Sequence, residues 1–136
     1  MAETRYYDAR KVTIVFDGVF ITGLAEGTFV DCSRNEESFE SEVGGQGEVD
    51  VSEINDPRGT ITVTLRQTSP SLPFLQAAAN QKRVAPLWVY SANSPREKTG
   101  GSEARLKKVA DVSHGARAEN RELEFEVFDY EAAAEA

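Results

Sequence analysis

The side chains that could perform covalent or metal-dependent chemistry are few in this sequence. The single cysteine, Cys32, has no histidine or cluster of bases nearby, and a nucleophilic thiol needs such a partner to lower its pKa. The single histidine, His114, follows Asp111 at a spacing that is common by chance, and one histidine cannot supply a His-rich metal site. We therefore expect no catalytic residue, no cofactor and no metal, with Cys32 as an inert, half-buried thiol.

Acidic residues concentrate in one segment, so a calcium site and a glycosidase site are considered next. From Glu26 to Asp56 the sequence holds ten acids and one base, Arg34, a net charge of −9. Calcium loops space their oxygen ligands at alternate positions, whereas Asp50, Glu53 and Asp56 are three apart. Glycosidases need two carboxylates that converge in a cleft, and these acids lie on a glycine-rich segment. The segment is suited to making contacts, and we expect the protein not to be an enzyme.

Length and composition describe one folded domain over residues 1–136. The 136 residues are 40% hydrophobic and 28% charged, enough for a core in a chain of ordinary domain size. The net charge of −8 argues against nucleic-acid binding as the main function. No apolar run approaches the roughly 20 residues that span a bilayer, and the first residues lack a secretory signal. We expect no membrane insertion.

Hydrophobic periodicity predicts a mainly β fold. Apolar and polar residues alternate along 12–16, 59–67 and 122–127, as in strands with one buried face. This alternation places Ile61, Val63, Leu65 and Phe125 in the core. The all-apolar run 87–90 predicts a strand that is buried on both faces, with Trp88 inside.

One helix is predicted, at about 71–81. Ser69 and Ser71 offer capping hydroxyls, and Pro70 and Pro73 are tolerated only in a first turn. The expected architecture is two packed antiparallel β-sheets, sandwich-like or barrel-like, with this helix on the flank. Residues 1–10 are expected to form an N-terminal arm and residues 131–136 a frayed tail, because the tail has nothing to bury.

The segment 35–57 is an exception to the strand pattern. A stretch this long without a strong core pattern is usually functional or mobile. We interpret it as a long acidic loop or hairpin that contacts a neighbouring copy, and a solvated loop on a monomer is the alternative. The expected contact residues are Glu36, Glu37, Phe39, Glu40, Glu42, Val43, Glu48, Val49, Asp50 and Val51.

A basic region follows the acidic one. Residues 82–108 carry a net charge of +5, and opposite charges on one chain can meet within a molecule or between copies. The expected basic counter-surface consists of Arg96, Lys98, Arg105, Lys107 and Lys108.

An ordered set of motifs resembles a known family through about half the chain. The matching stretches are Gly23 to Val30, Arg34 to Phe39, Val43-Gly44, Gly47 to Val49, Asn55-Asp56 and Gly59 to Ser71. They resemble the tail tube protein of contractile-tailed (myovirus-type) bacteriophages, which is related to the tube proteins of R-type bacteriocins and type VI secretion.

The resemblance implies a structural virion protein. Tail tube proteins form hexameric rings that stack into the inner tail tube, through which phage DNA passes into the host. The partners implied for this protein are further copies of itself, the tail sheath protein, tape measure and baseplate or tail-terminator proteins, and DNA in transit without specific binding. The implied location is the virion tail, assembled in the host cytoplasm. Glu122, Glu124 and Glu126 share one strand face and are candidates for the lumen wall.

Three alternatives remain open. The chain could be the tube subunit of a phage-like bacteriocin or type VI secretion particle. It could be a small monomeric β-barrel binding module, which would stay monomeric at high concentration. An enzyme with converging carboxylates would show a deep pocket that holds perturbed acids.

Overall fold

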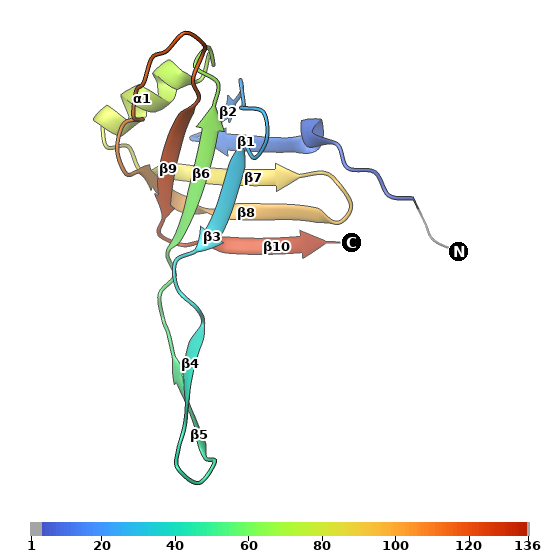
Figure 1. The fold of residues 1–136 in the computed structure, drawn as a ribbon, viewed down its shortest axis with the longest axis vertical. Helices are drawn as coiled ribbons and strands as arrows, with labels where there is room; N and C mark the ends of the chain where they lie inside the picture. Colours follow the sequence, from blue (N-terminus) through green and yellow to red (C-terminus); the bar gives the residue numbers. More distant parts are fainter. Residues whose placement is uncertain (1–3, 136) are drawn as a thin grey trace.

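Eight antiparallel strands form one sheet that bends until its two halves face each other (Figure 1). The strand order is β2-β1-β7-β8-β9-β6-β3, β10 also pairs with β8, and β4 and β5 form a separate two-stranded sheet. The Phe16 ring on β1 lies 5.1 Å from the Phe125 ring on β9, so the halves pack against each other. The predicted mainly β fold with two antiparallel sheets and one helix is confirmed, and the large sheet is not a closed barrel.

The computed structural model describes residues 4–135. Its elements are η1 (Ala9–Lys11), β1 (Val12–Phe16), β2 (Val19–Ile21), β3 (Val30–Arg34), β4 (Phe39–Val43), β5 (Val49–Glu53), β6 (Gly59–Leu65), α1 (Leu72–Asn80), β7 (Ala85–Ser91), β8 (Arg96–Leu106), β9 (Arg121–Val127) and β10 (Glu131–Glu135). Residues 4–8, in the predicted N-terminal arm, lead away from the sheet as extended chain, and residues 1–3 of that arm lie outside the described range (Figure 1).

Strand β8 belongs to both halves of the sheet because it bends at two glycines. It pairs with β7 over most of its length but with β9 only at residues 104–106. Gly100 has φ +145°, and a Cβ there would lie 2.0 Å from the carbonyl oxygen of Leu87. At Gly101 a Cβ would clash with the side chains of Val127 and Asp129. Only glycine fits where the sheet turns from one layer into the other.

The register shifts by one residue beside this bend, and Asp129 satisfies the displaced backbone. Ser102 and Glu103 together oppose Pro86 across the β7–β8 pair, which is the arrangement of a β-bulge. The Asp129 carboxylate accepts hydrogen bonds from the backbone N–H groups of Ser102 (3.1 Å) and Glu103 (3.0 Å) and from the Ser102 hydroxyl.

The core lies between the two halves of the sheet. Ile61, Val63 and Leu65 on β6 and Phe125 on β9 are fully buried, which confirms their predicted place. Trp88 was predicted to be in the core, and this prediction is wrong. Leu87 and Val89 point inward while Trp88 lies half-buried on the outer face, because β7 is covered on one face only.

The predicted helix is confirmed as α1, with Pro73 in its first turn, and Leu75 and Ala78 pack into the core. The Ser71 hydroxyl makes no helix-capping hydrogen bond, contrary to expectation. It accepts instead from the backbone N–H of Thr22 at 2.9 Å, and the Ser69 hydroxyl donates to the Thr22 carbonyl at 2.6 Å. These hydroxyls hold the start of the helix against the segment that follows β2.

The expected frayed tail is wrong for residues 131–135. These residues form β10, which pairs with residues 96–100 of β8. All five side chains are exposed, so no hydrophobic pattern marked the strand. Backbone hydrogen bonds form it, because β9 leaves β8 at the bend and exposes an unpaired stretch of β8 edge.

Replacing Leu65 tests the position of the core. Leu65→Ala should lower the free energy of unfolding by about 2–5 kcal/mol, because the side chain is fully buried. The neighbouring Thr64→Ala, on the outer face, should change it by less than about 1 kcal/mol. Chemical denaturation measures both, and similar values for the two variants would contradict the strand phase.

The Asp129 hydrogen bonds predict a pH dependence of stability. Burial opposes ionisation of the carboxyl group, but its hydrogen bonds to Ser102 and Glu103 outweigh this and hold its pKa below the ordinary value of 3.8. The carboxylate therefore contributes stability above the ordinary pKa, and this contribution disappears as the pH falls through the lowered pKa.

Asp129→Asn should accordingly destabilise the protein at pH 7, and the difference from the unmodified chain should shrink below about pH 4. Urea denaturation between pH 3 and pH 7 checks this. Asp50→Asn, at an exposed carboxylate, is the matched control and should change the free energy of unfolding by less than about 0.5 kcal/mol. A difference at Asp129 that stays constant down to pH 3 would contradict the assignment.

Candidate assembly site

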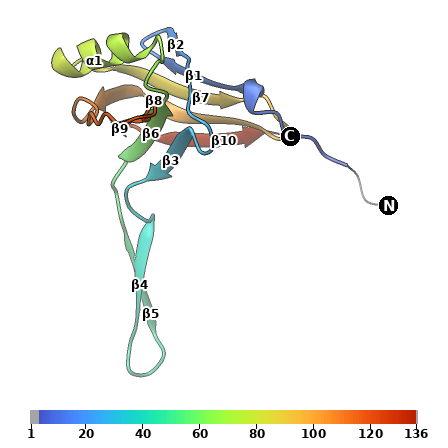
Figure 2. The ribbon, with the colours of Figure 1, turned by 45° about the horizontal axis from the view of Figure 1, so that its top comes forward.

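The hairpin of β4 and β5 projects far from the rest of the protein (Figures 1 and 2). We refer to residues 36–53 as the arm. Within the described residues its two strands pair only with each other, and every residue of both is exposed. Its tip turns at Gly47, which has φ +88°, and the Gly44 N–H donates to the Glu48 carbonyl at 2.7 Å. The segment predicted as a loop or hairpin is therefore a hairpin that extends into solvent.

The cross-strand register separates the side chains of the arm by chemistry. Directly opposed residues share a face. The apolar side holds Phe39, Ser41, Val43, Val49, Val51 and Glu53, and the acidic side holds Glu40, Glu42, Asp50 and Ser52. Phe39, Val43, Val49 and Val51 are 51%, 71%, 60% and 57% exposed. The arm is thus an amphipathic ribbon, and no other part of residues 4–135 covers its apolar side.

The root of the arm, unlike its length, is held in place. The Arg58 guanidinium donates two hydrogen bonds to the Asp56 carboxylate, at 2.8 and 2.9 Å, and approaches Glu126 at 3.8 Å. Hydrogen bonds from the Arg58 side chain and backbone N–H lower the pKa of Asp56 to about 2. The Thr60 hydroxyl donates to the Asn35 side-chain oxygen at 2.7 Å. These contacts fix the direction in which the arm leaves β3 and β6.

All ten predicted contact residues lie on the arm, and their contact with a second copy remains a prediction. The structure divides these residues between an apolar and an acidic side of the arm, which the sequence analysis did not predict. Seven acids and no base lie between residues 36 and 53, and none of these acids forms a salt bridge within the described range.

The predicted basic residues fall into two groups at opposite ends of β8. Arg96 and Lys98 lie near its first residue, and Arg105 and Lys107 lie beyond the bend. Lys107 pairs with Glu124 at 3.3 Å and Lys108 with Asp111 at 3.2 Å. The five bases therefore do not form one continuous counter-surface.

Glu122, Glu124 and Glu126 share the outer face of β9, as their spacing predicts. They lie opposite Thr64, Thr62 and Thr60 of β6. We refer to these six residues as the acidic sheet face. Lys107 and Arg58 pair with two of the acids at its margins. The position of this face in a lumen remains a prediction.

Sequence reasoning missed a second sheet face, on the outer side of β2, β1, β7 and β8. Phe20, Val15 and Trp88 form one cross-strand row, and Thr13, Tyr90 and Lys98 form the next. We refer to these six residues as the aromatic face. Phe20 is 64% and Tyr90 38% exposed. The run 87–90 has no polar residue to show which side faces out, so only the polar partners Thr13 and Lys98 could have indicated it.

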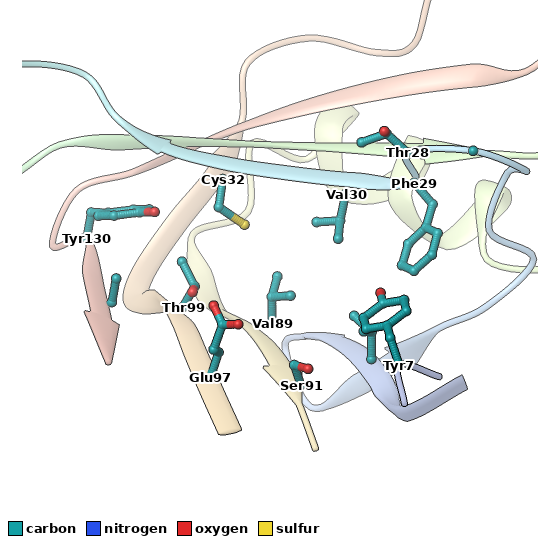
Figure 3. A pocket seen from close by; sticks show the side chains of 13 residues that line it. Tyr7, Thr28, Phe29, Val30, Cys32, Val89, Ser91, Glu97, Thr99 and Tyr130 are labelled. Carbon is teal, nitrogen blue, oxygen red and sulfur yellow. The ribbon is translucent and has the colours of Figure 1, made fainter. Parts of the chain in front are cut away.

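A cleft of about 560 Å³ opens between the two halves of the sheet (Figure 3). Val30 and Cys32 on β3 face Val89 and Thr99 across it, with Tyr130 at one end. Burial, aided by the charge of Asp31, raises the pKa of the Cys32 thiol to about 11. The thiol is therefore protonated at neutral pH and is not an activated nucleophile.

Residues 4–135 contain neither a cluster of metal ligands nor a helix that could span a membrane. No group of three or more His, Cys, Asp or Glu side chains in this part of the chain is placed to hold a metal ion. None of its helices has the length and apolar character needed to cross a bilayer.

Two solved structures share this fold over nearly their full length. The sheath/tube terminator of an extracellular contractile injection system (PVC), in its extended state, superposes with a TM-score of 0.68 at 11% identity, covering 98% of this chain and 100% of that one. The tube-terminating cap of the anti-feeding prophage (AFP) superposes with a TM-score of 0.60 at 9% identity, covering 98% and 95%. No family model and no curated protein sequence matches the chain. Identities this low show a shared fold.

Substitutions on the apolar side of the arm should leave the isolated subunit unchanged. Val51→Thr keeps the β-branched shape but replaces a methyl group with a hydroxyl on an exposed position. In dilute protein the free energy of unfolding should change by less than about 0.5 kcal/mol. Val63→Thr, at a fully buried position, is the control and should cost more than 1 kcal/mol, on the order of the penalty for burying an unpaired hydroxyl. Equal costs would mean that the arm packs on its own domain.

Proposed function

We propose that this protein is a structural subunit of a contractile tail-type particle, in which copies join into a ring of its inner tube. The main support for the proposal is the exposed apolar side of the arm. A two-stranded hairpin is marginally stable by itself in water, and this one exposes four large apolar side chains. An exposed apolar surface on a projecting element indicates a binding partner, and a symmetric ring supplies one arm and one receptor for every copy.

The finer form of the proposal is a hexameric ring that stacks into the inner tail tube of a phage. The resemblance of residues 23–71 to tail tube proteins supports it, and so does the fold shared with two proteins that end such tubes. The acidic sheet face would then line the lumen, where carboxylates repel the phosphates of passing DNA. Sheath, tape measure and baseplate or terminator proteins would be the further partners.

A terminator or cap is the second candidate function. The structural likeness favours it, because both solved structures are terminating components and both match over at least 95% of their own chains. A terminator closes a tube with one ring, whereas a tube subunit repeats along the axis. The two candidates therefore predict different assemblies from the same subunit.

Electron microscopy of negatively stained, concentrated protein tests the proposal. Long tubes would support the tube subunit, separate rings would support the terminator, and a sample of monomers at every concentration would contradict both. A variant that lacks residues 37–53 should fold, because the arm contributes no residue to the core, and should form neither rings nor tubes. Its thermal unfolding, compared with that of the full chain, shows whether the domain is intact. Rings formed by the shortened chain would contradict the role of the arm.

A further inference from the structure

The aromatic face has the composition of a binding surface and no partner within the described part of the chain. Its rows combine Phe20, Val15, Trp88 and Tyr90 on neighbouring strands, and tryptophan and tyrosine are enriched where interfaces are fully desolvated. Gly100, next to Trp88 in the register, has no side chain to cover the indole ring. The surface is therefore apolar at its centre, where Trp88 is half-buried and Phe20 is exposed.

Bases without carboxylate partners border this face. A groove of about 450 Å³ runs beside Tyr90, and its lining includes the bases Lys11, Arg96 and Lys98 and the acids Glu97 and Glu135. The Lys98 ammonium lies 4.2 Å from the centre of the Trp88 ring and 5.7 Å from that of Tyr90. Within residues 4–135, Lys11, Arg96 and Lys98 form no salt bridge. The three bases exceed the two acids of this rim, so an apolar centre with a net positive rim favours an apolar partner that carries negative charge.

We propose that the arm of a second copy is that partner, and that its apolar side lies on the aromatic face. The arm has the matching character, because its valines and Phe39 lie on one side and its seven acids form no salt bridge within residues 4–135. Glu53 shares the apolar side with Phe39, so docking by that side turns one of these acids toward the receptor. The proposal rests on the assembly of copies proposed above and adds the receptor surface.

Geometry and charge disfavour the other sites. The arm points away from the aromatic face of its own chain (Figures 1 and 2), so the receptor belongs to another copy. The acidic sheet face would place Glu122 and Glu124 against Glu53 on the apolar side of the arm, and like charges brought together are costly. The residues that line the cleft beside Cys32 include Glu97 and no base, so the cleft offers the acids of the arm no opposite charge.

Photo-cross-linking of the full chain tests the proposal. A benzoylphenylalanine at position 51, in the middle of the apolar side, is mixed with isotopically labelled protein so that intermolecular cross-links are identified by mass. We expect cross-links to peptides containing residues 13–20 and 86–98 of the labelled copy. The same group at position 52, on the acidic side, should give these products in a yield lower by about threefold or more, a factor that corresponds to less than 1 kcal/mol.

Cross-links mainly to residues 28–32 or 121–127, or no intermolecular cross-links, would overturn the proposal. Micrographs of the same sample distinguish a failure of the docking site from a failure of the proposed function. Rings with cross-links elsewhere would overturn the docking site and leave the proposed function standing, whereas the absence of both rings and cross-links would overturn both.

A charge reversal and the only tryptophan of the sequence provide a second test. Lys98→Glu should reduce the cross-link yield by about threefold or more, because it replaces an attraction at the rim with a repulsion. Arg117→Glu, the same change at an exposed base in the loop before β9, is the matched control and should leave the yield unchanged.

Trp88 emission should shift to shorter wavelength on assembly of the full chain, because the docked arm excludes water from the ring. An unshifted emission in assembled protein, or equal losses in the two charge variants, would contradict docking at this face.

Discussion

A two-stranded ribbon cannot shield its own apolar side chains from water, and the arm of this protein is such a ribbon. Every other strand lies in a sheet with a buried face, whereas β4 and β5 have solvent on both sides. The ion pair between Arg58 and Asp56 fixes the root of the ribbon, so its apolar side is presented in a defined direction. This exposed apolar side is the reason for our proposal that a second copy completes the arm.

The bend in β8 creates the surfaces that such a molecule can meet. Because Gly100 and Gly101 let one sheet turn on itself, its two halves bury a shared core and expose two outer faces. One half carries carboxylates and threonines, and the other carries aromatic rings with bases that form no salt bridge within residues 4–135. A single sheet thus provides both the acidic sheet face and the aromatic face, which we propose as the receptor of the arm, without any additional domain.

The sequence predicted those features that follow from local periodicity. The alternation along 59–67 and 122–127 identified buried side chains of β6 and β9 and the shared face of the β9 acids. The side of Trp88 could not be predicted, because a wholly apolar run has no period to show it. Strand β10 could not be predicted either, since its pairing depends on a β8 edge that exists only after the bend. The resemblance to tail tube proteins agrees with a fold found in contractile injection systems. It could not reveal the two sides of the arm or the aromatic face, because both depend on the register of the strands.

Hydrogen exchange of the arm amides reports directly whether the arm gains a partner on assembly. Exchange is compared between dilute protein and concentrated, assembled protein, with peptides that cover residues 39–43 and 49–53. An arm without a partner opens readily, so its amides should exchange fast in the dilute sample and should be slowed by about tenfold or more on assembly, a gain of roughly 1.4 kcal/mol in local stability. Peptides from β6 should be protected in both samples. Arm amides that exchange equally fast in both states, or that are already protected in dilute protein, would contradict the account.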